Sequence, residues 1–432
     1  MDMTFPNTDH TLPFPAWGHL GIRAYDIDAD HNDHREPMTI RCWRIFSALL
    51  DTKEGKELVS RLEQDRRVNE LNGKMISSGS GASRFDVKNL AMWFLWLWNR
   101  SSKETADTAL ERFLDDAEID VLALIGLEGI STKKTMQLMS NFRILPVEEL
   151  PECGLKDEIY RERFSHTLFN NKTSVDSFLA GQCNVPKVSE LCNDRPNFDS
   201  LKDLWTWFGH AYDRALLLNC LRGIASLPSF QTTLVSNESP FGPFGGSGGG
   251  KYFHGRLADH VHTHDSIDET AFATLVSGFE SKSASQKDSW RMVLTRLAFA
   301  KTAIAPTDAA LELGIAIEMM LQHDNANRDQ LSLAFRLRGA WLLEPADATA
   351  RRDVYDKLKL LYNCRSEVAH TGNLTQKNRD SFESDRTHLN EIGERIAQQL
   401  LTRRGISWDD VILASVQDAE PSDAPQPRNE AF

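Results

Sequence analysis

A series of amphipathic helical segments in the C-terminal part of the chain limits the possible folds more than any other feature. Apolar residues recur there at the spacing of one helix face, and the breaks between segments are short. Pro306 can begin one helix, Pro345 follows the end of another, and Gly372 can end a third. Such a series predicts an antiparallel helical bundle. The expected helices cover 267–281, 286–303, 307–322, 328–343, 349–370 and 376–403.

The preceding part of the chain has a mixed pattern. Strands are expected among the short apolar stretches of 118–150 and 228–262, whereas 151–195 is rich in turn residues. Further helices are expected at 37–50, 53–70, 85–99, 103–116 and 199–224. The sequence therefore predicts an α+β protein with an N-terminal mixed α/β region and a C-terminal all-α bundle. Its expected parts are an irregular segment (1–34), a sensor or substrate-selecting region (35–265), the bundle (266–408) and an acidic, disordered tail (409–432).

Charge and hydropathy narrow the class of protein. The formal net charge of −13 argues against a surface covered with nucleic-acid-binding residues. Residues 289–408 are less acidic, with 17 Lys and Arg against 15 Asp and Glu. The most apolar segment, Leu90–Trp98, is far shorter than the ~20 residues of a membrane span. Because the N-terminus lacks a signal-peptide pattern and the cysteines lack paired spacing, we expect a cytoplasmic protein without membrane contact.

One pair of residues in the bundle has clear chemical potential, Arg365 followed by His370. The spacing alone says little, because roughly one such match is expected by chance at ordinary residue frequencies. A second copy is present at Arg161–His166. Arg365 differs in lying on the apolar face of its expected helix, where a charge is costly without a partner or a function. That face consists of Val354, Leu358, Leu361 and Val368.

An arginine and a histidine together can cut RNA without a metal. His370 would take the proton from a ribose 2′-hydroxyl or give one to the leaving 5′-oxygen, and Arg365 would stabilise the charge on the phosphorane. The product would be a 2′,3′-cyclic phosphate, and no metal or other cofactor is expected. One pair supplies too few groups for both proton transfers, so we expect a homodimer with a composite site. The alternative is that Arg365 pairs with a buried acid and His370 caps the helix end.

Three segments of the bundle together resemble one known family. They are Ala310–Met320, Leu331–Leu343 and Tyr355–Gly372, the last with the core Tyr-x-x-Arg-Ser-x-x-x-His-x-Gly. In this order they are similar to the Apea-like HEPN domain, over residues 290–405. The upstream segment from Leu122 to Pro151 is similar, more loosely, to regions found beside that domain.

The resemblance implies a dimerising helical bundle that acts as a metal-independent endoribonuclease, often in toxins or in defence against phage. Arg365 and His370 match the family's catalytic pair, and Tyr362, Ser366 and a buried Glu318 are expected to support them. Ser366 departs from active members, which often have Asn, Asp or His at that position. The expected partners are an RNA such as tRNA and a regulatory protein or phage trigger. The alternative is a non-catalytic HEPN module that dimerises and binds RNA, a nucleotide or a protein.

Three other patterns carry less weight. Gly245–Tyr252 resembles a phosphate-binding loop, but Tyr252 stands where Ser or Thr would hold magnesium, so a nucleotide hydrolase that depends on Lys251 is not favoured. The acidic turn Asp26–Pro37 lacks the glycine and the glutamate of a calcium loop. His260, His262 and His264 alternate along an expected strand, but no clear fourth zinc ligand lies nearby.

Overall fold

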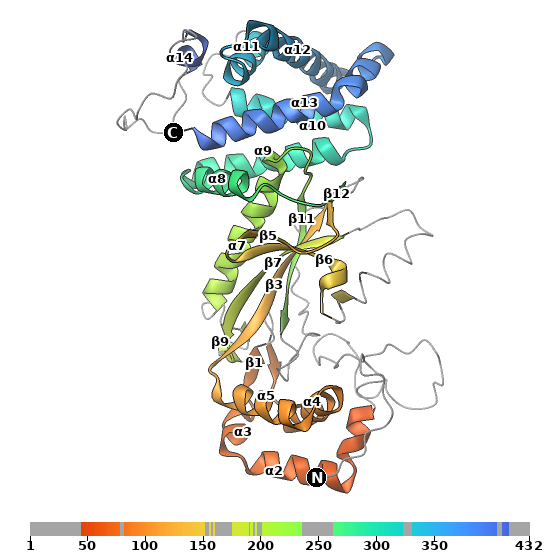
Figure 1. Ribbon diagram of the computed structural model, residues 1–432, viewed down its shortest axis with the longest axis vertical. Helices are drawn as coiled ribbons and strands as arrows, with labels where there is room; N and C mark the ends of the chain where they lie inside the picture. The colour runs from red at the N-terminus through yellow and green to blue at the C-terminus, as the bar shows by residue number, and fades with distance from the viewer. Residues whose placement is uncertain are drawn as a thin grey trace. The chain divides into compact units, whose positions relative to one another are not determined.

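The computed structural model describes residues 45–77, 82–151, 155–156, 159, 175–189, 191–192, 195–196, 201–235, 262–322, 331–403 and 408–413. The chain divides into two compact units that alternate along the sequence. The first unit comprises Met1–Tyr212, Pro228–Leu257 and Thr263–Ser266, and the second comprises Asp213–Leu227, Ala258–His262 and Ile267–Phe432. Strands and helices form the first unit and helices dominate the second, so the fold is α+β (Figure 1).

A five-stranded sheet organises the first unit, in the order β11-β3-β7-β6-β5. Its longest strands are β3 (Glu118–Glu128) and β7 (Ser177–Pro186), which run antiparallel and pair along almost their whole length. The other strands of this sheet are β5 (Met136–Met139), β6 (Phe142–Pro146) and β11 (Leu227–Val235). Short sheets are built from β1 (Met75–Ser77), β2 (Ala82–Arg84), β4 (Ile130–Thr132), β8 (Val188–Ser189), β9 (Leu191–Cys192), β10 (Arg195–Pro196) and β12 (His262–His264).

Helix α4 (Val87–Arg100) forms the main helical part of the core of the first unit. Every residue from Asn89 to Leu97 is buried, including Trp93 and Trp96. The sequence predicts this burial, because Leu90–Trp98 contains no polar residue that could face solvent. These tryptophans are therefore core residues and do not form a surface on which bases could stack. The helices around α4 in the first unit are α2 (Lys53–Gln64), α3 (Arg66–Leu71) and α5 (Lys103–Asp115).

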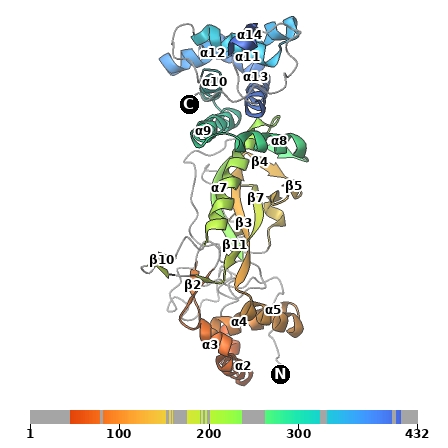
Figure 2. The ribbon, with the colours of Figure 1, turned by 90° about the vertical axis from the view of Figure 1, so that its left-hand side faces the viewer.

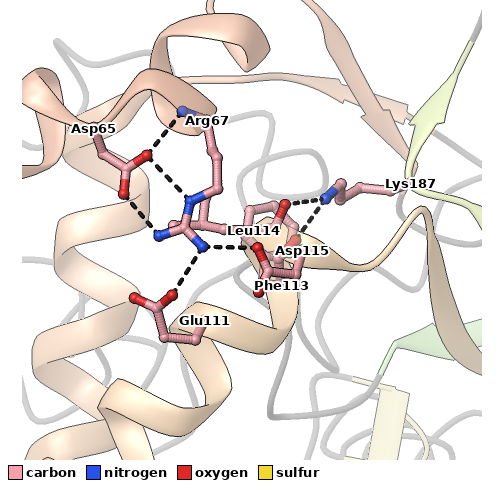
Figure 3. Close-up of polar contacts among 7 residues, drawn as sticks. All are labelled: Asp65, Arg67, Glu111, Phe113, Leu114, Asp115 and Lys187. Atoms are coloured by element: carbon pink, nitrogen blue, oxygen red, sulfur yellow. Dashed lines mark hydrogen bonds and ion pairs between the residues drawn. The ribbon is translucent and has the colours of Figure 1, made fainter.

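Arg67 joins the start of α3 to the end of α5 (Figure 3). Its guanidinium donates to Asp65 at 2.9 Å, to Glu111 at 2.8 Å and to Asp115 at 2.7 Å. These three carboxylates raise the pKa of Arg67 further above its ordinary value, with Asp65 contributing most. The arginine thus fixes the bend at Asp65, where the chain leaves α2 and enters α3.

Cationic side chains from other elements satisfy the C-terminal carbonyl groups of several helices. Lys187 is buried beside α5 and donates to the carbonyl oxygens of Phe113 at 2.6 Å and Leu114 at 3.0 Å (Figure 3). Burial lowers the pKa of Lys187, but the carbonyl groups at a helix end attract a positive charge. Arg386 does the same for α9 (Ala284–Thr302), and Arg338 for α10 (Pro306–Leu321).

The second unit is a helical bundle whose long helix α13 (Gln376–Thr402) contacts most of the others (Figures 1 and 2). The other helices are α8 (Glu269–Glu280), α9 (Ala284–Thr302), α10 (Pro306–Leu321), α11 (Leu331–Leu343), α12 (Ala348–Thr371) and α14 (Trp408–Leu413). Apart from α14, their ends differ by at most three residues from those that the apolar periodicity predicts.

The second unit also takes in a segment from the middle of the chain, Asp213–Leu227. Helix α7 (Lys202–Leu217) runs into this segment and ends there. The side chain of Asn219 then turns the chain, because its Nδ2 donates to the carbonyl oxygens of Leu216 at 2.9 Å and Ser226 at 2.7 Å. Its Oδ1 accepts from the Ser226 N–H at 2.8 Å.

A buried ion pair fastens this segment to the bundle. Lys301 of α9 lies 2.7 Å from Glu394 of α13, and both side chains are almost wholly buried. The Lys301 ammonium also donates to the carbonyl oxygens of Asn219 at 2.7 Å and Ile224 at 2.6 Å, and Glu394 accepts from the Gly223 N–H at 3.1 Å. Burial lowers the pKa of Lys301 and raises the pKa of Glu394, although each partner opposes the shift of the other.

The secondary structure differs from the sequence predictions in four places. Helix α7 ends at Leu217, so the expected helix 199–224 is too long. The turn-rich region 151–195 contains the ten-residue strand β7. The expected helix 53–70 is broken at Asp65, and α14 occupies the beginning of the expected disordered tail.

Several predicted features lie outside the described residues, namely the segment 1–34, the Arg161–His166 pair, the loop Gly245–Tyr252, His260 and the tail beyond 413. Within the described ranges, no group of three or more His, Cys, Asp and Glu side chains is arranged to hold a metal ion. Every helix in those ranges is too short or too polar to cross a lipid bilayer.

Candidate active site at the end of helix α12

Helix α12 carries both Arg365 and His370 close to its C-terminus. Asp347 begins the helix by accepting hydrogen bonds from two backbone N–H groups of the first turn. The helix ends at Gly372, whose φ of 72° is left-handed and whose N–H bonds to the carbonyl of Val368. The predicted cap at Gly372 is therefore confirmed, and His370 lies in the last helical turn.

Arg365 turns toward helix α10 and forms an ion pair with Glu318. Its Nη2 lies 2.5 Å from Glu318 Oε2, and the two side chains are 27% and 22% exposed. Glu318 is thus partly exposed, not buried as predicted. The Nε of Arg365 is buried and has no hydrogen-bond partner among the described residues. The charge that the sequence places on the apolar face of α12 therefore has a partner on the facing helix.

Gly314 makes the approach of Arg365 to Glu318 possible. It lies one turn before Glu318 on α10, and a Cβ at this position would be 2.6 Å from both Cβ and Cγ of Arg365. Unbonded carbon atoms do not come so close, so the stem of the arginine crosses α10 only because Gly314 has no side chain. The sequence alone hides this role, since it depends on the packing of α10 against α12.

We expect the methyl group added in Gly314→Ala to force the two helices apart, at a steric cost of about 1–3 kcal/mol. Alanine offsets roughly 1 kcal/mol of this cost through its higher helix propensity, so the free energy of unfolding should fall by up to about 2 kcal/mol. Denaturant unfolding measures the change. Gly209→Ala is a matched control, since an added Cβ in α7 meets nothing within 4 Å and stability should rise. Equal shifts in the two variants would contradict the packing role of Gly314.

The turn that follows His370 is held by Glu367. Its carboxylate accepts from the Asn378 side-chain amide at 2.6 Å and from the Thr375 N–H at 2.9 Å, at the start of α13. These hydrogen bonds, the one from Asn378 first, lower the pKa of Glu367. The side chain of His370 is exposed and forms no hydrogen bond or ion pair with the described residues. The imidazole is therefore carried on a fixed turn and remains accessible to a ligand.

Tyr362 and Ser366 lie on the same side of α12 as His370. The ring of Tyr362 packs edge-on against Phe335 of α11, with 5.5 Å between the ring centroids. The hydroxyl of Ser366 is partly buried and has no hydrogen-bond partner among the described residues. Tyr362 therefore supports the packing of α11 and α12, and Ser366 can donate to a bound anion.

Arg365 and His370 point to different sides of α12. Because the helix is regular through Thr371, five residues separate them by about 140° around the axis and ~7.5 Å along it. No fraying swings His370 toward Arg365, and neither a hydrogen bond nor an ion pair joins the two side chains. A single copy of the chain thus presents the arginine toward α10 and the histidine toward solvent.

Comparisons with known proteins leave the site unassigned. A scan against protein-family models found no match, and searches of curated proteins and of solved structures found none either. The assignment of this site therefore depends on its own residues and on their geometry.

Proposed function

We propose that this protein is a metal-independent endoribonuclease of the HEPN type, with the helical bundle as its catalytic part. The proposal rests on one observation: within two turns of α12, an arginine oriented by Glu318 is followed by an exposed histidine. A cation fixed before the substrate arrives stabilises developing charge at little cost of reorganisation. An exposed imidazole can exchange a proton near neutral pH.

In the proposed reaction, one His370 imidazole removes the proton from a ribose 2′-hydroxyl. The 2′-oxygen bonds to the adjacent phosphorus, the bond from phosphorus to the 5′-oxygen breaks, and a second, protonated imidazole gives its proton to that oxygen. Arg365 stabilises the charge on the phosphorane, and the Ser366 hydroxyl donates to a phosphate oxygen. The products are a 2′,3′-cyclic phosphate and a free 5′-hydroxyl.

A homodimer supplies the second imidazole. Each chain has one His370 at this position and directs its Arg365 toward α10, so the complete set of groups needs two copies. We therefore infer a composite site to which both copies contribute their Arg365 and His370. The first unit would select the RNA or sense a trigger, which agrees with a toxin or an anti-phage effector. A structured RNA such as tRNA suits the site, because its loops expose bases and 2′-hydroxyl groups.

Incubation of the full-length protein with tRNA in EDTA tests this proposal. We expect cleavage to persist without metal and to fall by at least about 100-fold in Arg365→Ala and in His370→Ala. Mass spectrometry of the fragments should show 2′,3′-cyclic phosphate ends. His388→Ala is the matched control, because this histidine lies on α13 near Asp353 and outside the site. RNA that is bound but never cut would contradict the proposal.

A non-catalytic HEPN module that dimerises and binds RNA, a nucleotide or a protein is the second candidate. One specific observation favours it, since the ion pair with Glu318 neutralises the arginine that a phosphate would need. Ser366 also favours this candidate, because active HEPN members often have Asn, Asp or His at that position. This candidate predicts that His370→Ala binds RNA as tightly as the unchanged protein and that neither protein releases a product.

A further inference from the structure

One side of helix α12 carries basic and aromatic side chains without an acid. Relative to Tyr355, the side chains of Arg352, Lys359, Tyr362, Ser366 and His370 all fall within a sector of about 80°, and they extend for roughly 27 Å along the axis. We call these six residues the α12 stripe. The stripe contains no acid, although the whole chain has a net charge of −13.

The acidic residues of α12 lie outside the stripe, at about 100–160° from Tyr355. Two of them are turned toward α13, where Glu367 bonds to Asn378 and Asp353 lies 3.9 Å from His388. The third, Asp356, pairs with Arg352 at 3.0 Å and partly neutralises that end of the stripe. Helix α11, which flanks the stripe, contains no acidic residue at all.

The cations along the stripe alternate with aromatic rings. The guanidinium groups of Arg336, from α11, and Arg352 lie 5.1 Å and 5.5 Å from the centre of the Tyr355 ring. Arg336 donates to the carbonyl of Ser332 and has no acidic partner among the described residues. Lys359 is exposed and forms no ion pair or hydrogen bond with any described side chain. Charges held without partners on a surface of an acidic chain are available for an anionic ligand.

We propose that the α12 stripe binds a single-stranded segment of RNA and leads it to His370. Phosphate groups would pair with Lys359 and Arg336, and bases would stack on the ring of Tyr355 and on the guanidinium planes beside it. Alternating rings and cations suit unpaired nucleotides, because each base offers a face for stacking and each phosphate a negative charge. An acidic peptide would use the cations but would offer no base to stack beside the rings. This inference rests on the proposed ribonuclease function and adds the path of the substrate.

Binding of a strand that cannot be cut tests the stripe apart from catalysis. The probe is a fluorescein-labelled oligouridine with 2′-O-methyl groups, which lack the attacking hydroxyl, and its anisotropy is measured with the full-length protein in EDTA at several salt concentrations. We expect Lys359→Ala to weaken binding and to reduce the slope of log Kd against log salt by about 0.7, the value for one phosphate contact on a single strand. Tyr355→Ala should weaken binding on the order of 5- to 150-fold, as for the loss of one stacked base.

A charge-matched control separates local contact from overall charge. Lys359→Glu and Lys56→Glu change the net charge equally, but Lys56 is an exposed residue of α2 in the first unit. We expect only Lys359→Glu to abolish binding. Since Lys359 has no ion pair or hydrogen bond to lose among the described residues, its variants should unfold at the same temperature as the unchanged protein. Equal binding by the two variants overturns the proposal. Displacement of the probe by polyglutamate as readily as by unlabelled RNA also overturns it, in favour of an acidic protein partner.

The proposal for the α12 stripe and the proposed ribonuclease function can be disproved independently. If the uncuttable strand binds through Lys359 but native RNA is never cleaved, the stripe stands and the proposed enzyme does not. If native RNA is cleaved with the same KM by Lys359→Glu and by the unchanged protein, the enzyme stands and the stripe is wrong.

Discussion

Pairing one unchanged chain with one His370→Ala chain in a dimer is expected to lower the ribonuclease rate by at least about 100-fold. The composite site of this mixed dimer keeps only one of the two imidazoles that the two proton transfers need. If each chain instead contained a complete site, the mixed dimer would keep about half of the unchanged rate. Co-expression with two different affinity tags and two-step purification yields the mixed dimer.

This experiment separates a composite site from a site within one chain. The geometry makes the distinction sharp, because Arg365 bonds to Glu318 while His370 faces solvent on another side of α12. A differently tagged pair of unchanged chains serves as the control and should keep the full rate. A mixed dimer with half of the unchanged rate would contradict the composite site. If no mixed dimer can be isolated at any concentration, the homodimer itself is wrong.

Replacing Glu394 with alanine is expected to be the most damaging change to stability, with a loss of about 3–5 kcal/mol in the free energy of unfolding. The Lys301 ammonium would remain buried without its counter-ion, and the Gly223 N–H would lose its acceptor. Burial already lowers the pKa of Lys301, so removal of the carboxylate favours the neutral amine. Urea unfolding followed by circular dichroism measures the loss.

Glu391→Ala is the matched control for this change. Glu391 lies one turn earlier on the same helix and pairs with Arg222 at 2.7 Å, but the arginine is 82% exposed. An exposed pair contributes at most about 1 kcal/mol, so this variant should unfold almost like the unchanged protein. Glu394→Gln keeps an acceptor for Lys301 and Gly223 and should fall between the two. Similar losses for Glu394→Ala and Glu391→Ala would contradict the importance of the buried pair.

The sequence predicts those parts of the fold that local periodicity determines. The helices of the bundle each bury one apolar face, and Gly372 ends α12 because only glycine adopts its φ easily. Strand β7 escapes prediction because its identity depends on pairing with β3, whose partner residues lie 50 to 68 positions earlier in the chain. The end of α7 is hidden by the apolar run Leu216–Leu218, and the break comes from the side chain of Asn219.

In the candidate site too, the sequence predicts local features but not the contacts between helices. A charge on the apolar face of α12 signals that Arg365 needs a partner, and the resemblance to HEPN domains points to Glu318 on the expected helix 307–322. The direction of His370 follows from helix geometry alone once the cap is known. Residue spacing does not predict the steric role of Gly314, nor the hydrogen bonds of Glu367 to the start of α13. Both depend on how separate helices pack against each other.

The segment Asp213–Leu227 has a consequence for how such a protein can evolve. The helical unit closes only with these residues, since Lys301 takes two of its carbonyl partners from them. A gene fusion that carried only the helices beyond residue 266 would leave the buried Lys301 ammonium without those two carbonyl acceptors. The two halves therefore cannot be shuffled at a single crossover point. A lineage that exchanges its N-terminal half must retain this segment or rebuild it inside the new one.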